Sequence, residues 1–312
     1  MKRFLLYIVL FIIPLVLLAI GIEAAVRSIP NSYKYKDTWM QKNGGAVETI
    51  ILGNSLSYHG INPSCLKDAF NLANEGQRLE IDLFLLNKYL PICSNLKNIV
   101  LCINQVNLFQ DEYESKREPT WQTLIYYGLY MGYPKHGPFS EYSYELTIPK
   151  QALTKAGRWC KSYVKGLPFD INCDSLGWND SKDNVKKKDK NKMTKSYFEL
   201  QSKLGLKVDL QKYHNNIEYL REIIQICSDH KLHLIVIQTP QIKDYLYSLD
   251  HEMIALVREV GKDLKSVPSV TYKDYSENSR FSLNSSYFFD GIHMGPEGAN
   301  AFTEVIRKDF NL

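Results

Sequence analysis

Residues 47–56, Val-Glu-Thr-Ile-Ile-Leu-Gly-Asn-Ser-Leu, decide the fold class of this chain. A short apolar run that ends at a glycine is typical of a buried strand in a parallel sheet. Further extended segments are predicted at 70–72, 98–103, 232–237 and 269–272, and helical patterns at 77–90, 215–229, 245–265 and 296–309. Strands that alternate with helices predict an α/β fold, with a parallel sheet covered by helices on both faces.

Ser55 lies at the carboxyl end of the first predicted strand. Active sites of open α/β sheets gather at this edge, so Ser55 is a candidate nucleophile. A serine in this place is also typical of a helix cap or a turn. Ser57 is a nearby competitor, and His59, four residues after Ser55, fits a surface or supporting position better than that of a catalytic base.

Asp290 and His293 stand three residues apart, just before the last predicted helix. At this spacing the carboxylate can accept the Nδ1 proton of the imidazole and leave Nε2 free to take a proton from a serine. The alternative is an ordinary helix N-terminus with Asp290 near the cap. Together with Ser55, the two residues supply the side chains of a hydrolytic triad.

Four segments, in order, resemble the conserved blocks of the SGNH (GDSL-type) hydrolases over residues 47–312. They are Ile-Leu-Gly-Asn-Ser-Leu at 51–56, Asn-Leu-Ala-Asn-Glu-Gly at 71–76, Val-Leu-Cys-Ile-Asn-Gln at 100–105 and Phe-Asp-Gly-Ile-His-Met-Gly-Pro-Glu-Gly-Ala at 289–299. The resemblance implies a three-layer αβα, flavodoxin-like fold. It also implies Ser55, His293 and Asp290 as catalytic residues, and an oxyanion hole formed by the backbone N–H groups of Ser55 and Gly76 and the side chain of Asn104.

The chain departs from the family pattern in the first and third blocks. Asn54 replaces the usual Asp beside the nucleophile, Cys102 stands where the family has Gly, and Gln105 stands where it has Asp. The weakened third block leaves Asn107 as an alternative to Asn104 in the oxyanion hole.

Residues 4–22 carry no charge and follow Lys2 and Arg3. At 1.5 Å per residue a helix of this length reaches about 30 Å, the thickness of a bilayer's hydrocarbon core. We predict an uncleaved transmembrane anchor at 1–23 and a linker at 24–46, with a cleaved secretory signal as the alternative. Basic residues favour the cytoplasmic side, so the catalytic domain at 47–312 is expected outside, in the periplasm or on the cell surface.

Residues 111–213 interrupt the alternation of strands and helices and are predicted to form a cap or insertion. The insertion is rich in aromatic residues that suit stacking on sugar rings or simple packing against the domain. These residues are Trp121, Tyr126, Tyr127, Tyr130, Tyr133, Phe139, Tyr142, Tyr144, Trp159 and Trp178. Within it, residues 181–195 hold seven Lys and two Asp, and we expect a solvated, disordered loop there. That loop accounts for the net charge of +4, so no nucleic-acid partner is predicted.

The six cysteines show neither a CxxC pair nor a Cys/His spacing suited to zinc. We predict no metal site and no cofactor. Cys160 with Cys173 is the preferred candidate for a disulfide in an oxidising compartment, whereas Cys102 and Cys227 lie in apolar segments and are expected in the core.

The predicted function is that of a serine esterase or O-acyltransferase that uses an acyl-serine intermediate. The anchor and the resemblance favour O-acyl groups, most simply O-acetyl, on an envelope or exported polysaccharide, with a membrane-bound O-acyltransferase as a possible partner. The alternatives are a non-catalytic anchored domain that binds a glycan or an assembly partner, and a lysophospholipase or thioesterase.

Overall fold

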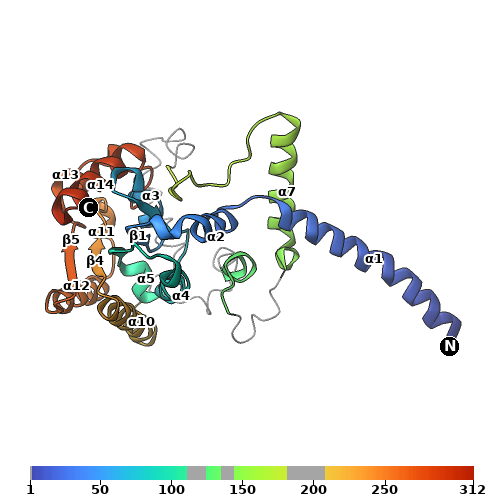
Figure 1. Cartoon of the computed structure of the whole chain (residues 1–312), viewed down its shortest axis with the longest axis horizontal. Coiled ribbons are helices and arrows are strands. Elements are labelled where there is room, and N and C mark those ends of the chain that lie inside the picture. Colours follow the sequence, from blue (N-terminus) through green and yellow to red (C-terminus); the bar gives the residue numbers. More distant parts are fainter. Residues whose placement is uncertain (1, 111–123, 135–143, 181–207) are drawn as a thin grey trace. The chain divides into compact units, whose positions relative to one another are not determined.

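The computed structural model describes residues 2–110, 124–134, 144–180 and 208–312 (Figure 1). The chain divides into two compact units. The sheet unit comprises residues 38–120 and 173–312, and the helical unit comprises residues 1–37 and 121–172.

The sheet unit is built on five parallel strands, in the order β2-β1-β3-β4-β5. The strands are β1 (Thr49–Leu52), β2 (Ala69–Asn71), β3 (Asn98–Cys102), β4 (His233–Gln238) and β5 (Val270–Asp274). This is the strand order of the flavodoxin-like doubly wound sheets, in which the chain reverses direction across the sheet between β1 and β3. The predicted α/β fold with a parallel sheet is therefore confirmed.

Helices cover the sheet on both faces (Figure 1). One layer contains α3 (Ser55–Gly60) and α14 (Pro296–Phe310), and the other contains α4 (Leu79–Tyr89), α5 (Gln105–Phe109), α10 (Leu210–Asp229) and α12 (His251–Lys265). Short helices α11 (Lys243–Leu246) and α13 (Ser279–Ser282) precede α12 and the C-terminal loop. The central strands β1, β3 and β4 are mostly apolar and almost entirely buried, as expected for a sheet covered on both faces.

The range 245–265 was expected as one helix, and the structure divides it into α11 and α12. The break has a local cause, because the Asp250 side chain accepts a hydrogen bond from the Glu252 backbone N–H at 2.8 Å and caps a new helix. The apolar pattern alone did not reveal this cap.

The expected linker at 24–46 is largely helical. Helix α1 (Lys2–Ser28) runs into this range, and α2 (Ser32–Asn43) occupies most of the remainder. In the sheet unit the Trp39 ring stacks on Phe70 of β2, with centroids 4.0 Å apart, and Met40 is fully buried. A long-range aromatic contact thus fixes part of the range that was expected to be a linker.

The helical unit contains α1, a π-helical turn (Tyr127–Met131), the 3₁₀ turn η6 (Glu145–Thr147) and α7 (Pro149–Val164). Residues Leu6–Ser28 of α1 are long and apolar enough to cross a membrane, and only 6% of their most apolar 18-residue stretch is buried. A buried core helix does not fit this exposure, so α1 has the properties of an anchor or a signal sequence.

Several aromatic residues of the predicted insertion pack within the helical unit. Tyr127 is fully buried, with its ring 5.0 Å from the ring of Tyr33 in an edge-on arrangement. This contact supports a packing role for part of the aromatic set. Trp121, Phe139 and Tyr142 lie outside the described residues, as does the Lys-rich loop at 181–195.

The expected Cys160–Cys173 disulfide is not present, because all six cysteines are free thiols. Cys102 and Cys227 are fully buried, as predicted for core residues.

The outer edge of β2 is occupied by a segment that returns from the insertion. The Asn71 backbone N–H donates a hydrogen bond to the Leu176 carbonyl at 2.9 Å. Gly177 permits this close approach, since its φ is +83° and an added Cβ would lie 2.3 Å from the Asn71 carbonyl oxygen.

Gly53 forms the turn between β1 and α3, with a φ of +119°. A Cβ at this position would lie 2.6 Å from Ser57 Oγ and 3.3 Å from Cys102 Cβ. Both the backbone conformation and the packing therefore require glycine at the turn that carries Ser55.

We expect Gly53→Ala to lower the free energy of unfolding by at least about 1–3 kcal/mol, the range for a strained backbone conformation. Gly45→Ala is the matched control, because its added Cβ would meet Ser94 Oγ at an ordinary 3.6 Å. Urea denaturation followed by far-UV circular dichroism measures both variants. Equal stability of the two variants would contradict the steric role of Gly53.

Candidate active site

Ser55 is the first residue of α3 and is held there by the turn before it. The Asn54 side-chain oxygen accepts a hydrogen bond from the Leu56 backbone N–H at 3.1 Å and caps the helix. The Gly53 backbone N–H donates to Asp82 Oδ1 on α4 at 2.8 Å, and Gln77 Nε2 donates to the same oxygen at 2.5 Å. Because the turn is fixed on both sides, Ser55 has a defined place at the carboxyl edge of the sheet.

Asp290 organises the loop that precedes α14. Its Oδ1 atom accepts hydrogen bonds from the backbone N–H groups of Ile292 at 2.9 Å and His293 at 2.7 Å. Its Oδ2 atom lies 2.7 Å from His293 Nδ1. The carboxylate therefore fixes both the loop backbone and the imidazole ring.

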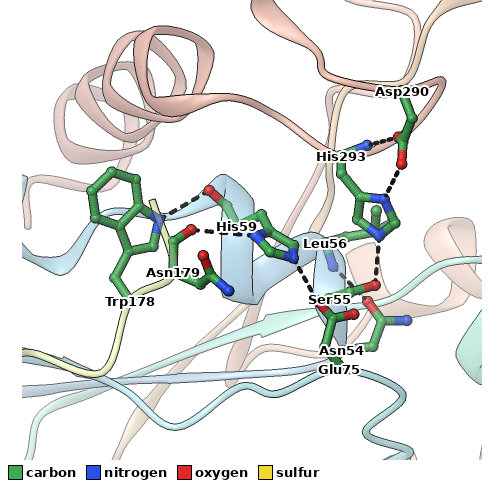
Figure 2. Close-up of polar contacts among 9 residues, drawn as sticks. All are labelled: Asn54, Ser55, Leu56, His59, Glu75, Trp178, Asn179, Asp290 and His293. Carbon is green, nitrogen blue, oxygen red and sulfur yellow. Dashed lines mark hydrogen bonds and ion pairs between the residues drawn. The ribbon is translucent and has the colours of Figure 1, made fainter. Parts of the chain in front are cut away.

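The opposite ring nitrogen of His293 faces Ser55 (Figure 2). His293 Nε2 lies 2.7 Å from Ser55 Oγ. With the Nδ1 proton directed to Asp290, Nε2 is free to accept the proton of the serine hydroxyl. The structure thus brings the three predicted triad residues into one hydrogen-bonded chain, with the connectivity of a Ser-His-Asp triad.

The contacts between His293 and Asp290 shift the pKa of both side chains. Burial lowers the pKa of His293, but the charge and hydrogen bond of Asp290, with a contribution from Glu75, raise it above its ordinary value of 6.5. Burial raises the pKa of Asp290, but the charge and hydrogen bond of His293 and the two backbone N–H groups outweigh this effect. They hold the pKa of Asp290 below its ordinary value of 3.8. Asp290 is therefore ionised at neutral pH, and an imidazolium formed at His293 is stabilised by it.

Asn104 follows β3, which is adjacent to β1 in the sheet. Its Oδ1 caps α5 by accepting hydrogen bonds from the backbone N–H groups of Val106 at 2.7 Å and Asn107 at 3.2 Å. Its Nδ2 lies 3.4 Å from Asn54 Oδ1, a long hydrogen bond beside the nucleophile turn. The amide nitrogen is thus on the side of Asn104 that faces the candidate site.

Asn107, the alternative to Asn104, is occupied by the backbone of its own turn. Its Oδ1 accepts the Asn104 N–H at 2.8 Å, and its Nδ2 donates to the Cys102 carbonyl at 2.8 Å. The geometry favours Asn104 over Asn107 as a donor to a substrate.

Gly76 has a φ of +66°, a conformation that favours glycine, in the loop after β2. The preceding segment is joined to α3, because Asn71 Nδ2 donates to the carbonyls of Ser57 and Ile61, each at 3.0 Å. The second block of the sequence is thereby connected to the helix that begins at Ser55.

Ser57 and His59, the competitors of the predicted triad, are both buried. Ser57 lies beneath Gly53 and is fully inaccessible to a substrate. His59 is 2% exposed, so it is not the surface residue that the sequence suggested as one possibility. Its Nε2 lies 2.6 Å from Glu75 Oε1, and its Nδ1 lies 3.3 Å from the Asn179 carbonyl (Figure 2).

Sequence reasoning missed two carboxylates beside the site, Glu75 and Asp82. Asp82 is fully inaccessible, and burial raises its pKa to about 7. The available signal was its position among the apolar residues of a helical pattern, where a lone carboxylate needs a partner. Glu75 gave no comparable signal, because its partner His59 is distant in sequence.

The sequence matches no protein-family model and no curated protein. Among solved structures, one match is described as a platelet activating factor from Streptococcus pneumonia, with that assignment marked as provisional. It is 11% identical in sequence, with a TM-score of 0.44, and the alignment covers 97% of this chain and 99% of that one. So distant a likeness carries no argument about activity.

We expect Asp290→Asn to lower the pKa of His293 by about 1–3 pH units, the effect typical of an adjacent opposite charge. Both the attraction and the charged hydrogen bond that raise this pKa are lost in the variant. NMR titration of histidine-labelled protein measures the change, with His293 assigned through a His293→Gln variant. Asp250→Asn, at the α12 cap, should leave the pKa of His293 unchanged, and an equal pKa in both variants would refute the assigned coupling.

Proposed function

We propose that this chain is a serine esterase or O-acyltransferase of the SGNH type, which forms an acyl intermediate on Ser55. The observation that carries the proposal is the continuous hydrogen-bonded chain from Ser55 Oγ through His293 to Asp290. The proposal is supported further by the flavodoxin-like strand order, which brings the ends of β1 and β3 together at the usual ligand-binding edge.

In the first half-reaction, His293 Nε2 takes the proton from Ser55 Oγ while the oxygen attacks the carbonyl carbon of an ester. The tetrahedral intermediate carries a negative charge on the former carbonyl oxygen. His293 then gives its proton to the leaving alcohol, and the acyl group remains on Ser55. Asp290 holds the ring orientation and stabilises the imidazolium during both transfers.

We assign the stabilisation of the oxyanion to three donors, the backbone N–H groups of Ser55 and Gly76 and the side-chain Nδ2 of Asn104. Two features support this assignment. Ser55 is the first residue of α3, and Asn104 Nδ2 makes two long hydrogen bonds, to Asn54 Oδ1 at 3.4 Å and to Cys102 Sγ at 4.0 Å. A substrate carbonyl that replaced these contacts would meet a donor already fixed by the α5 cap.

In the second half-reaction an acceptor hydroxyl loses its proton to His293 and attacks the acyl-serine. The bond between the acyl carbon and Ser55 Oγ then breaks, and His293 returns the proton to Ser55 Oγ. Water as acceptor gives an esterase, and a sugar hydroxyl gives an acyltransferase. The N-terminal apolar helix supports an anchored enzyme whose catalytic domain lies outside the cytoplasm. We therefore propose O-acyl groups, most simply acetyl, on an envelope or exported polysaccharide as substrate, with a membrane-bound O-acyltransferase as a possible partner.

We expect the purified full-length chain to release 4-nitrophenol from 4-nitrophenyl acetate and to react with a serine-directed phosphonate. Ser55→Ala should reduce turnover by at least about 10³-fold, as loss of a triad nucleophile does. Ser57→Ala is the matched control and should keep most of the activity, because Ser57 is buried beneath the turn. Initial rates from absorbance and mass spectrometry of the phosphonate adduct measure these outcomes.

The same assay separates the competing functions. Full activity in Ser55→Ala would refute the acyl-serine mechanism. Glycan binding without turnover would indicate a non-catalytic anchored domain, and a preference for long-chain over two-carbon esters would indicate a lysophospholipase or thioesterase.

A further inference from the structure

Helix α7 carries an exposed apolar surface on one side. Leu153, Cys160 and Val164 are spaced by seven and four residues and therefore lie on the same side of the helix. Leu153 is 64% exposed and Val164 is 84% exposed, and Leu167, just beyond the helix, is 59% exposed. So much exposed apolar side chain on one short helix indicates a binding surface.

Basic residues flank this apolar surface. Lys150, Arg158, Lys161 and Lys165 are exposed, and residues 149–167 contain no Asp or Glu. Trp159 and Tyr163 stack at the border of the apolar side, with centroids 5.8 Å apart. An apolar face with basic flanks and bordering aromatic rings is the pattern of a helix that lies in a lipid head-group region.

The opposite side of α7 is fixed within the helical unit. Lys155 is buried and forms an ion pair with the buried Glu145, which also accepts a hydrogen bond from the Tyr130 hydroxyl. The Lys155 ammonium lies 5.6 Å from the centroid of the Tyr126 ring. The helix therefore has a defined orientation in its unit, and its apolar side is consistently turned outward.

The connection to α1 sets the depth of α7. Glu23 is the first charged residue after the apolar range 4–22, and its carboxylate accepts hydrogen bonds from the backbone N–H groups of Glu145 and Leu146, each at 3.0 Å. These residues come directly before α7. Figure 1 shows that, within this unit, α7 crosses the axis of α1 instead of running along it.

We propose that α7 lies on the membrane surface and binds lipid through the side that carries Leu153, Cys160 and Val164. If α1 crosses the bilayer, Glu23 lies at its boundary, and a helix that starts there and crosses α1 follows the bilayer plane. The basic flanks then meet anionic head groups, which favours lipid over a protein occupant of this surface. The second membrane contact limits rotation and tilt of the helical unit about α1.

The test uses the full-length chain in nanodiscs of phosphatidylcholine and phosphatidylglycerol. An environment-sensitive fluorophore is attached to Cys160 in a background with Cys65→Ser and Cys173→Ser, since the other three cysteines are buried. The matched control moves the label to the polar side of the same helix, with Cys160→Ser and Thr154→Cys. A lipid with a nitroxide near its head group serves as quencher.

We expect the label at position 160 to shift its emission to shorter wavelength and to be quenched several-fold more strongly than the label at position 154. Equal quenching at both positions would overturn the proposal. A label at position 160 that is shielded from water but not quenched by the lipid would also overturn it, because protein would then cover the surface.

A second inference comes from a separate observation, the contact of the buried His59 with the exposed carboxylate of Glu75, and it rests on the proposed function. His59 lies one helical turn after Ser55 on α3, and Glu75 directly precedes Gly76. The 2.6 Å contact between His59 Nε2 and Glu75 Oε1 thus joins the nucleophile helix to the loop that carries an assigned oxyanion donor.

His59 is held on its other sides as well. Its Nδ1 faces the Asn179 carbonyl at 3.3 Å, and its backbone carbonyl accepts a hydrogen bond from Trp178 Nε1 at 2.9 Å. Its ring packs edge-on against His293, with centroids 5.3 Å apart. We infer that His59 and Glu75 are positioning residues that fix the Gly76 amide relative to Ser55 Oγ.

Replacing Glu75 tests this role by two measurements. Glu75→Ala should lower kcat for 4-nitrophenyl acetate about tenfold with little change in KM, as expected when a donor acts mainly in the transition state. It should also accelerate hydrogen exchange of the backbone amides around Gly76. In Glu75→Gln the side-chain oxygen can still accept a hydrogen bond from His59 Nε2. We therefore expect this variant to keep kcat and the rate of hydrogen exchange close to those of the wild type.

The exchange measurement does not depend on activity. If hydrogen exchange of the amides around Gly76 is unchanged in Glu75→Ala, the positioning role of His59 and Glu75 is wrong, even if the enzyme is active. Absence of Ser55-dependent hydrolysis in the wild type would instead refute the proposed function. Faster exchange around Gly76 in Glu75→Ala would in that case still support the positioning role of His59 and Glu75.

Discussion

The geometry of the candidate site depends on the carboxylate of Asp290. One oxygen binds two successive backbone N–H groups and thereby sets the path of the loop before α14. The other oxygen accepts a hydrogen bond from His293 Nδ1, and this orients the ring so that Nε2 faces Ser55. Removal of this carboxylate would therefore remove two loop hydrogen bonds and the hydrogen bond that orients the imidazole.

A parallel sheet makes the distant segments meet. β1 and β3 are adjacent although they are separated in sequence by β2 and α4, and both end at the same edge. The chain reverses direction across the sheet between these two strands, which is where open α/β sheets usually bind their ligands. Ser55 and Asn104 occupy the turns that follow these two strands, and α14 packs beside α3 to bring in His293.

The apolar runs were sufficient to predict β1, β3 and β4, because a strand covered on both faces is apolar over most of its length. The triad residues could be proposed because Asp290 and His293 are close in sequence and Ser55 follows an unmistakable strand. What the sequence did not reveal depends on contacts between distant residues. The stacking of Trp39 on Phe70 orders α2, and the pairing of His59 with Glu75 is equally non-local. The direction of the Asn104 amide follows from its capping of α5, which a family motif does not encode.

The segment that returns along β2 has a consequence for colloidal behaviour. An uncovered strand at the border of a sheet presents free backbone groups to other molecules and promotes self-association. Leu176 already occupies the Asn71 N–H at that border. At the other border, β5 is short and largely solvent-exposed, and its Lys273 forms an ion pair with Asp309 at 2.7 Å. Neither border therefore offers a long apolar template on which further chains could assemble.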